Sequence, residues 1–267
     1  MYEFNFHRPK SLDDAVKLLR SGEDASFLAG GQTLLQSLRQ RLAQPSDLVD
    51  LGAIAELRGI KRDGDAVVVG AMTRHAEVAR SSDVQQAIPA LSVLAGGIGD
   101  AQVRNMGTLG GSIANNDPAA DYPAGLVGLG ATVVTSDRSL SADDFFTGMF
   151  ETALEEDELI REVRFPAPKR AGYVKFAQPA SRYVLVSVMV AETGDGVRVA
   201  VSGAAPSVFR VPEMERALTS DFRPESLDGI SVPPDEMNED LHGSPEYRAH
   251  LVGVIAKRAV TAALGGH

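Results

Sequence analysis

The segment that most constrains this fold is VRNMGTLGGSIANNDPAADYPA, residues 103–124. It places two adjacent glycines, two adjacent asparagines, two aspartates and two prolines among hydrophobic neighbours. Glycine and asparagine tolerate left-handed backbone, and proline interrupts regular hydrogen bonding. The segment therefore cannot form a single helix or strand, and we expect it to serve a ligand.

A second stretch has the same design. LAGGQTLL (28–35) and TLGGSIAN (108–115) both predict a strand, a double glycine, a small polar residue and then a helix. Glycines let successive backbone N–H groups converge on one point, and a helix N-terminus adds a positive dipole end. Two such nests can hold a diphosphate without a basic side chain, which suits a chain of net charge -10. The pair predicts a dinucleotide, although either motif alone could be a tight turn or a helix cap.

Composition excludes several classes of protein. The 267 residues are 44% hydrophobic, enough for the cores of two or three compact units. The acidic balance argues against nucleic-acid binding. The chain has no cysteine, so it cannot itself hold a disulfide or a Cys-ligated iron–sulfur cluster. No signal-peptide core and no apolar run of about 18 residues is present, which predicts a cytoplasmic protein.

The sequence lacks the usual nucleotide and catalytic motifs. No P-loop is present, and neither GGIGDAQ nor GLVGLGATV satisfies G-x-G-x-x-G. The five histidines show no metal-ligand spacing, and no Gly-x-Ser-x-Gly elbow occurs. We therefore predict no metal site and no catalytic residue. His75 is expected on a helix surface, and the carboxylates of residues 155–158 in a solvated turn.

Periodicity and turn residues predict the elements. Ser11 caps a first helix that ends at Gly22. A β-α-β-like unit follows from a strand at 26–29, a helix carrying Leu34 to Leu42 and a strand at 47–51. Asp63-Gly64 predicts a hairpin. The remaining expected elements are helices from 73 and over 83–95, strands at 131–136 and 158–165, three strands after the Pro/Gly-rich segment 166–172, and helices at 211–218 and 246–264.

AGGQTLL together with QVRNMGTLGGSIANNDPAADYPA resembles the flavin-binding medium subunit of molybdenum hydroxylases, of the carbon monoxide dehydrogenase and xanthine dehydrogenase group. FFTGMFETALEEDELIREVRFP, KFAQPASRY and LHGSPEYRAHLVGVIAKRA resemble the same group. The likeness runs from the first helix to the last and is weakest over 221–240. It implies an α+β fold with two FAD-binding subdomains of the PCMH (vanillyl-alcohol-oxidase-like) type, residues 1–58 and 59–167. A C-terminal domain of antiparallel strands and helices, residues 168–267, would follow.

The resemblance also implies a cofactor, FAD, and a set of binding residues. One glycine loop would wrap the pyrophosphate and the other would supply a second cradle. Further residues would line the flavin cleft or meet the adenine end. The implied set is Leu28, Ala29, Gly30, Gly31, Gln32, Thr33, Leu34, Leu35, Ile98, Thr108, Leu109, Gly110, Gly111, Ser112, Asp121, Ile160, Lys175 and Tyr183.

Several of these residues have other interpretations. The family often has Asn or Asp where this chain has Ser112, which leaves only a backbone role there. Asp121 could simply cap the helix that begins at Tyr122. Lys175 could face solvent, Tyr183 could pack in the core, and Thr33 could cap a helix as well as bind the cofactor.

The function implied is electron transfer. A molybdenum cofactor on a large partner subunit would oxidise the substrate, and iron–sulfur clusters on a small partner subunit would relay electrons to this chain's FAD. An external acceptor, such as a quinone or NAD, would then take them, within a dimer of heterotrimers. Two alternatives remain at this point: a stand-alone FAD-dependent oxidoreductase, or a flavin-free dinucleotide-binding or assembly protein.

Overall fold

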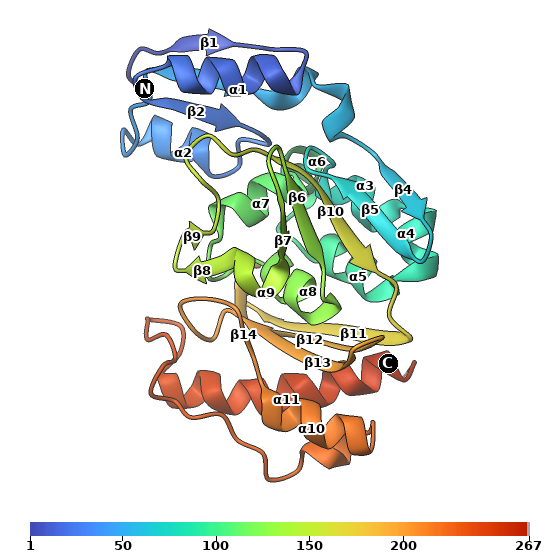
Figure 1. Ribbon diagram of the computed structural model, residues 1–267. Coiled ribbons are helices and arrows are strands. Elements are labelled where there is room, and N and C mark those ends of the chain that lie inside the picture. The colour runs from blue at the N-terminus through green and yellow to red at the C-terminus, as the bar shows by residue number, and fades with distance from the viewer. Residues whose placement is uncertain (266–267) are drawn as a thin grey trace.

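The computed structural model describes residues 1–265 and shows three stacked layers (Figure 1). A small parallel sheet with two helices lies at the N-terminal end, coloured blue. A five-stranded sheet with a group of short helices forms the middle. A four-stranded sheet with two helices, coloured orange and red, forms the C-terminal layer. Three hydrophobic clusters lie mainly within these layers, and the cluster of the middle layer extends onto the C-terminal sheet.

The N-terminal layer is a parallel sheet in the order β1–β3–β2. Its elements are β1 (Asn5–His7), α1 (Leu12–Ser21), β2 (Ala25–Leu28), α2 (Leu34–Arg39) and β3 (Asp47–Asp50), followed by the short turns η1 (Leu51–Ala53) and η2 (Ala55–Leu57). Ser11 caps α1 by accepting a hydrogen bond from the N–H of Asp14, as its sequence predicts. Helix α2 is shorter than predicted, because Leu42 lies outside it and is 76% exposed.

The middle layer is built on an antiparallel sheet in the order β4–β5–β10–β6–β7. The strands are β4 (Ile60–Asp63), β5 (Ala66–Gly70), β6 (Thr132–Thr135), β7 (Ser139–Ser141) and β10 (Ile160–Pro166). The helices are α3 (His75–Arg80), α4 (Ser82–Ala87), α5 (Pro89–Gly96), α6 (Ala101–Met106), α7 (Leu109–Asn115), α8 (Tyr122–Leu129) and α9 (Ala142–Phe145). The hairpin β8 (Phe146–Gly148) and β9 (Glu151–Thr152) lies beside them.

Two predictions for this layer were wrong. The helix expected over 83–95 is two helices, because Pro89 begins a new one and removes a backbone N–H from any continuous helix. The second double glycine does not follow a strand. It follows α6, and Gly110 and Gly111 lie inside the first turn of α7.

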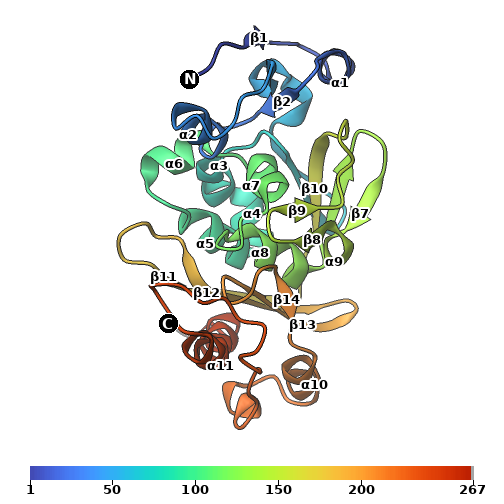
Figure 2. The same cartoon turned by 90° about the vertical axis from the view of Figure 1, so that its left-hand side faces the viewer.

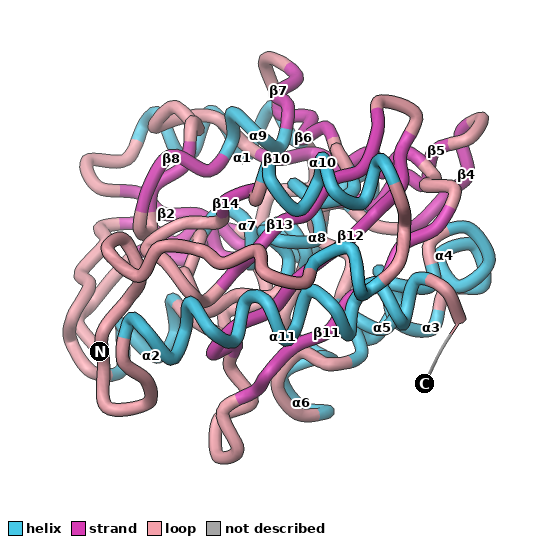
Figure 3. The backbone as a smooth tube through the Cα atoms, turned by 90° about the horizontal axis from the view of Figure 1, so that it is seen from below, coloured by secondary structure: helices cyan, strands magenta, loops and turns pink. Residues whose placement is uncertain are grey.

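The C-terminal layer is an antiparallel sheet of β11 (Arg170–Ala177), β12 (Val184–Thr193), β13 (Gly196–Ser202) and β14 (Phe209–Arg210). Helix α8 of the middle layer packs on one face of this sheet (Figure 2). Helices α10 (Pro212–Ser220) and α11 (Pro245–Ala263) cover the other face, with η3 (Pro224–Leu227) between them in sequence (Figure 3).

Close packing joins these layers. A Cβ on Gly128 of α8 would lie 2.5 Å from Cγ of Met189 in β12. A Cβ on Gly172 of β11 would lie 2.0 Å from the carbonyl oxygen of Ala259 in α11. Within residues 1–265, no helix is both long and apolar enough to cross a membrane.

Candidate functional site

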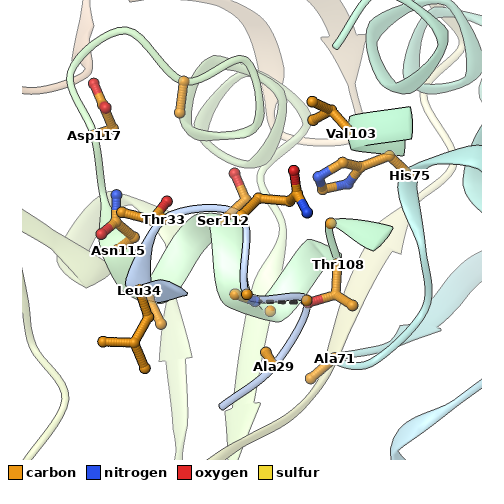
Figure 4. A pocket seen from close by; sticks show the side chains of 18 of the residues that line it. Ala29, Thr33, Leu34, Ala71, His75, Val103, Thr108, Ser112, Asn115 and Asp117 are labelled. Atoms are coloured by element: carbon orange, nitrogen blue, oxygen red, sulfur yellow. Dashed lines mark hydrogen bonds between the residues drawn. The ribbon is translucent and has the colours of Figure 1, made fainter. Parts of the chain in front are cut away.

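A cavity of about 550 Å³ lies where the N-terminal layer, the helices of the middle layer and the loop between β11 and β12 meet. Residues of both double-glycine segments line it (Figure 4). We name residues 28–35 the first glycine loop and residues 108–112 the second glycine loop. The cavity is therefore built on the two segments that the sequence singled out.

The first glycine loop presents unpaired backbone donors. Residues Ala29 to Leu34 all line the cavity. Among the described residues, no hydrogen-bond partner is found for the N–H groups of Gly30 through Leu34. Gly31 has a φ of 72°, a left-handed conformation that a side chain disfavours. Thr33 precedes α2, but its side chain makes no capping hydrogen bond. Free N–H groups on a glycine turn are suited to an anionic ligand.

In the second glycine loop, the N–H groups from Leu109 onward are already paired with other groups of the chain. The N–H of Leu109 donates to the carbonyl oxygen of Thr73 (3.0 Å), and that of Gly110 donates to the carbonyl oxygen of Ala71 (2.8 Å). The N–H of Gly111 donates to Oγ1 of Thr108 (3.2 Å), drawn in Figure 4. Neither glycine has a positive φ. The expected nest of free N–H groups is therefore absent from this loop.

Glycines at these positions allow close packing. A Cβ on Gly110 would lie 2.8 Å from the carbonyl oxygen of Ala71, and one on Gly30 would lie 2.4 Å from that of Met106. A Cβ on Gly111 would lie 3.2 Å from Cβ of Ala29. The two loops thus touch each other, and together they form one side of the cavity.

Asp121 lies in the cavity wall within a buried polar cluster. Its Oδ1 accepts hydrogen bonds from the hydroxyl of Tyr173 (2.7 Å) and from Nζ of Lys175 (2.8 Å). Nζ of Lys175 also donates to the carbonyl oxygen of Gly97 (2.8 Å). Burial raises the pKa of Asp121, while the charge of Lys175 opposes that rise. A buried carboxylate held this way is a fixed polar group on the cavity surface.

The contacts of this cluster exclude the alternative roles that the sequence left open for Asp121 and Lys175. Asp121 makes no side-chain capping hydrogen bond to α8, so the capping interpretation is wrong. The side chain of Lys175 is 10% exposed, so it does not face solvent. Lys175 does not itself line the cavity. It donates a hydrogen bond to Asp121 from the side away from the cavity.

Tyr183 lies at the cavity edge on the β11–β12 loop. It is 52% exposed and lines the cavity, so it does not pack in the core. Its neighbour Arg182 also lines the cavity and has a φ of 62°. Ile98 and Ile160 lie in the wall as well. These side chains give the cavity an aromatic and aliphatic surface beside its polar loops.

Most residues of the predicted site line this cavity, and four do not. Leu28, Leu35, Leu109 and Lys175 are outside its lining. Leu109 is fully buried in the core, and Leu35 packs under Gly31, where an added Cβ would lie 2.7 Å from its Cδ1. The leucines therefore anchor the loops.

Two residues that the sequence placed on the surface are buried in the cavity wall. His75 is 4% exposed, and burial lowers its pKa to about 4. Glu158 is 5% exposed, and its Oε1 and Oε2 accept hydrogen bonds from Arg138 at 3.0 and 2.9 Å. These contacts lower the pKa of Glu158 to about 2. Both surface predictions were wrong.

A sequence signal existed for only one of them. His75 stands three residues before the fully buried Val78, on the same helical face, so the helix period could have placed it inside. Glu158 is paired with an arginine 20 residues earlier, and no local pattern reveals that pair.

The cavity fits a dinucleotide better than a reactive substrate. It offers free backbone donors at one end and apolar and aromatic side chains elsewhere. Asp121 and Glu158 are each held by a basic partner, and the low pKa of His75 keeps it neutral. Within residues 1–265, no group of three His, Asp or Glu side chains could hold a metal ion. The arrangement binds and orients a ligand.

Comparison with known proteins supports the same kind of ligand. Residues 2–168 match the family model described as the FAD binding domain in molybdopterin dehydrogenase. The chain is 38% identical to the nicotine 6-hydroxylase medium subunit of Paenarthrobacter nicotinovorans, covering 96% of this chain and 95% of that protein. It is 37% identical to the carbon monoxide dehydrogenase medium chain of Hydrogenophaga pseudoflava, covering 97% and 96%.

A solved structure extends the likeness to the fold. The carbon monoxide dehydrogenase of Hydrogenophaga pseudoflava matches with a TM-score of 0.88 at 37% identity, over 99% of this chain and 98% of that chain. The resemblance and the α+β fold class predicted from the sequence, a PCMH-type FAD-binding domain followed by a C-terminal domain, are confirmed.

Proposed function

This chain belongs to the family of FAD-binding domains of molybdopterin dehydrogenases, and on that premise we propose that it carries electrons between protein partners. It is an FAD-binding oxidoreductase subunit of the molybdenum hydroxylase type. The proposal adds the direction: electrons arrive from iron–sulfur clusters of a small subunit and leave to an external acceptor.

The FAD would lie in the cavity described above. Its diphosphate would meet the free N–H groups of Gly30 through Leu34, with the second glycine loop packed behind as a close wall. Asp121, Ile98 and Tyr183 would contact the flavin half, and the backbone of Ile160 the adenine end. Lys175 would act by holding Asp121 in place. Leu28, Leu35 and Leu109 would support the loops through packing.

The bound flavin supplies the redox chemistry, and the chain supplies position and environment. Apolar residues such as Ile98 and Leu159 limit water in the cavity. The buried pair of Asp121 and Lys175 holds a carboxylate in a fixed position in the cavity wall.

Asp121 and Glu158 in the wall are both bound by basic residues, which makes them poor bases. Asp117 also lines the cavity, and its Oδ1 accepts a hydrogen bond from the N–H of Ala119 without a basic partner among the described residues. The pairing of the two buried carboxylates favours electron transfer over a stand-alone oxidoreductase.

We further propose that the chain works beside a large molybdenum-cofactor subunit and a small iron–sulfur subunit, as a dimer of heterotrimers in the cytoplasm. The names of its relatives, a medium subunit and a medium chain, support an assembly of this kind. The sequence has no cysteine, so any cluster must lie on another chain. The three-part division after residues 58 and 167 also stays a proposal, supported by three main sheets whose strands each lie within one of the three parts.

Cofactor identity has a direct test. Denaturing the purified protein should release FAD into the supernatant, because all the contacts proposed above are non-covalent. Recovery of FMN alone, or flavin that stays with the precipitated chain, would contradict the placement of a diphosphate in the first glycine loop. A purified chain with no flavin that also binds none would favour the assembly-protein alternative.

The partners need a second test. The chain alone should show a flavin spectrum without iron or molybdenum, and carbon monoxide, purines or simple aldehydes should not bleach it. Co-expressed with its neighbouring subunits, it should elute as a large assembly whose substrate bleaches the flavin. Direct bleaching of the lone chain by a substrate would instead establish a stand-alone oxidoreductase.

A further inference from the structure

The cavity wall contains a buried polar atom without a partner. His75 begins α3, and its Nδ1 is buried with no hydrogen-bond partner in residues 1–265. The residue lines the cavity, and Figure 4 shows its imidazole turned toward the interior, near Val103 and Thr108. Nδ1 is shielded from the cavity as well, so the ring nitrogen that a ligand there could reach is Nε2, which also has no hydrogen-bond partner in residues 1–265.

Its surroundings hold the imidazole in place. The ring packs against that of Tyr122, with centroids 5.4 Å apart. A Cβ on Gly107 would lie 2.6 Å from Nε2 of His75, so the imidazole lies directly against that glycine. The backbone N–H of His75 also donates to the carbonyl oxygen of Gly107 at 3.0 Å. Gly107 in turn touches Gly30 of the first glycine loop. The ring thus stands at the junction of the two loops.

A structural role alone does not explain a histidine here. Burial lowers its pKa to about 4, so at neutral pH the ring is uncharged and carries one N–H donor and one acceptor nitrogen. A buried polar atom without a partner costs stability, and a leucine or phenylalanine would fill the space without that cost. The polar ring is therefore explained by a ligand that pairs with it.

We propose that His75 is a cofactor-binding residue that donates a hydrogen bond from its neutral imidazole to the diphosphate–ribityl part of FAD. In the second glycine loop the N–H groups of Leu109, Gly110, Gly111 and Ser112 are all paired within the chain, and only that of Thr108 has no partner in residues 1–265. His75 supplies the donor on that side of the cavity. This inference rests on the proposed placement of FAD between the loops and is independent of the electron route.

The test compares FAD affinity with the stability of the flavin-free chain. In the full-length chain, His75→Leu should weaken FAD binding about tenfold or more, the loss expected for one hydrogen bond to a charged group. Thermal unfolding without flavin should occur at the same or a higher temperature, because an unpaired buried nitrogen is removed. His75→Asn and His75→Gln place an amide N–H near Nδ1 and Nε2 respectively, and one of them should restore binding.

Tyr122→Phe is the matched control. It removes a buried hydroxyl that also lacks a partner in residues 1–265 but does not line the cavity, so FAD affinity should be unchanged. Wild-type affinity in His75→Leu would overturn the inference. So would weaker binding that comes with a lower unfolding temperature and is restored by neither amide. Failure of the wild-type chain to bind FAD would instead overturn the proposed site itself.

Discussion

The two glycine loops share a sequence pattern but differ in structure. In the first, the N–H groups of Gly30 through Leu34 are free and Gly31 adopts a left-handed backbone. In the second, every N–H from Leu109 to Ser112 is paired, and the two glycines are helical residues packed against neighbouring backbone. The first loop can receive an anion, whereas the second forms a closely packed wall against which the proposed FAD would lie.

The difference shows that a double glycine has two separate uses. A glycine can adopt a backbone conformation that leaves N–H donors unpaired. It can also let two segments pack so closely that no Cβ atom would fit between them. The letters GG do not distinguish the two. The deciding information lies in Ala71 and Thr73, distant residues whose carbonyl groups accept the donors of the second loop.

The largest effect is expected at Gly110. Gly110→Val should lower the free energy of unfolding by about 3 kcal/mol, because the added Cβ itself would overlap the backbone of Ala71 whatever the rotamer. Chemical denaturation of the flavin-free chain would measure the loss. Gly194→Val is the control, since Gly194 has no atom within 4 Å of an added Cβ. Near-wild-type stability of Gly110→Val would show that the second loop is open like the first.

The pH dependence of the free energy of unfolding tests whether His75, beside the second loop, is buried. Burial, aided by the charge of Arg104, lowers the pKa of His75 from 6.5 to about 4. Below pH 6.5 the unfolded chain takes up a proton that the folded chain resists. The stability due to neutral His75 is therefore full above pH 6.5 and is lost as pH falls toward 4. The loss is up to about 3 kcal/mol.

His75→Leu should remove this decline from denaturation curves measured between pH 7 and pH 4. A separate decline below pH 4.5 should persist in the variant, because the contacts of Glu158 lower its pKa to about 2. An unchanged decline between pH 6.5 and 4 in His75→Leu would mean that another group controls this range.

The first loop should respond in ligand binding more than in folding. Gly31→Ala forces a side chain into a φ of 72°, at a cost of about 1–2 kcal/mol in the free energy of unfolding. If the turn relaxes, its free N–H groups diverge and FAD affinity falls. Titration of the flavin-free variant with FAD would measure this. Gly64→Ala, also at positive φ but in the β4–β5 turn away from the cavity, should share the stability cost and keep wild-type affinity.

The same contrast explains how far sequence reasoning reached. Local rules located the Ser11 cap, the Asp63-Gly64 hairpin and the three long strands of the C-terminal sheet, because each depends on residues within a few positions. The resemblance led to the cavity, yet the state of the second loop, the burial of His75 and the Arg138–Glu158 pair escaped prediction. The state of the second loop and the Arg138–Glu158 pair depend on contacts between segments far apart in the chain, which periodicity does not encode. The burial of His75 is different, because the helix period does point to it.

The smallest expected difference concerns the threonines that precede the two loop helices. Thr108 accepts a hydrogen bond from the N–H of Gly111, whereas the side chain of Thr33 caps nothing. Thr108→Ala should therefore cost about 1 kcal/mol of stability, the usual value of an N-cap, and Thr33→Ala should cost little. Thermal unfolding of the two flavin-free variants would measure both. Equal losses would mean that the first loop also closes on its own threonine in solution, and its free donors would then no longer account for cofactor binding.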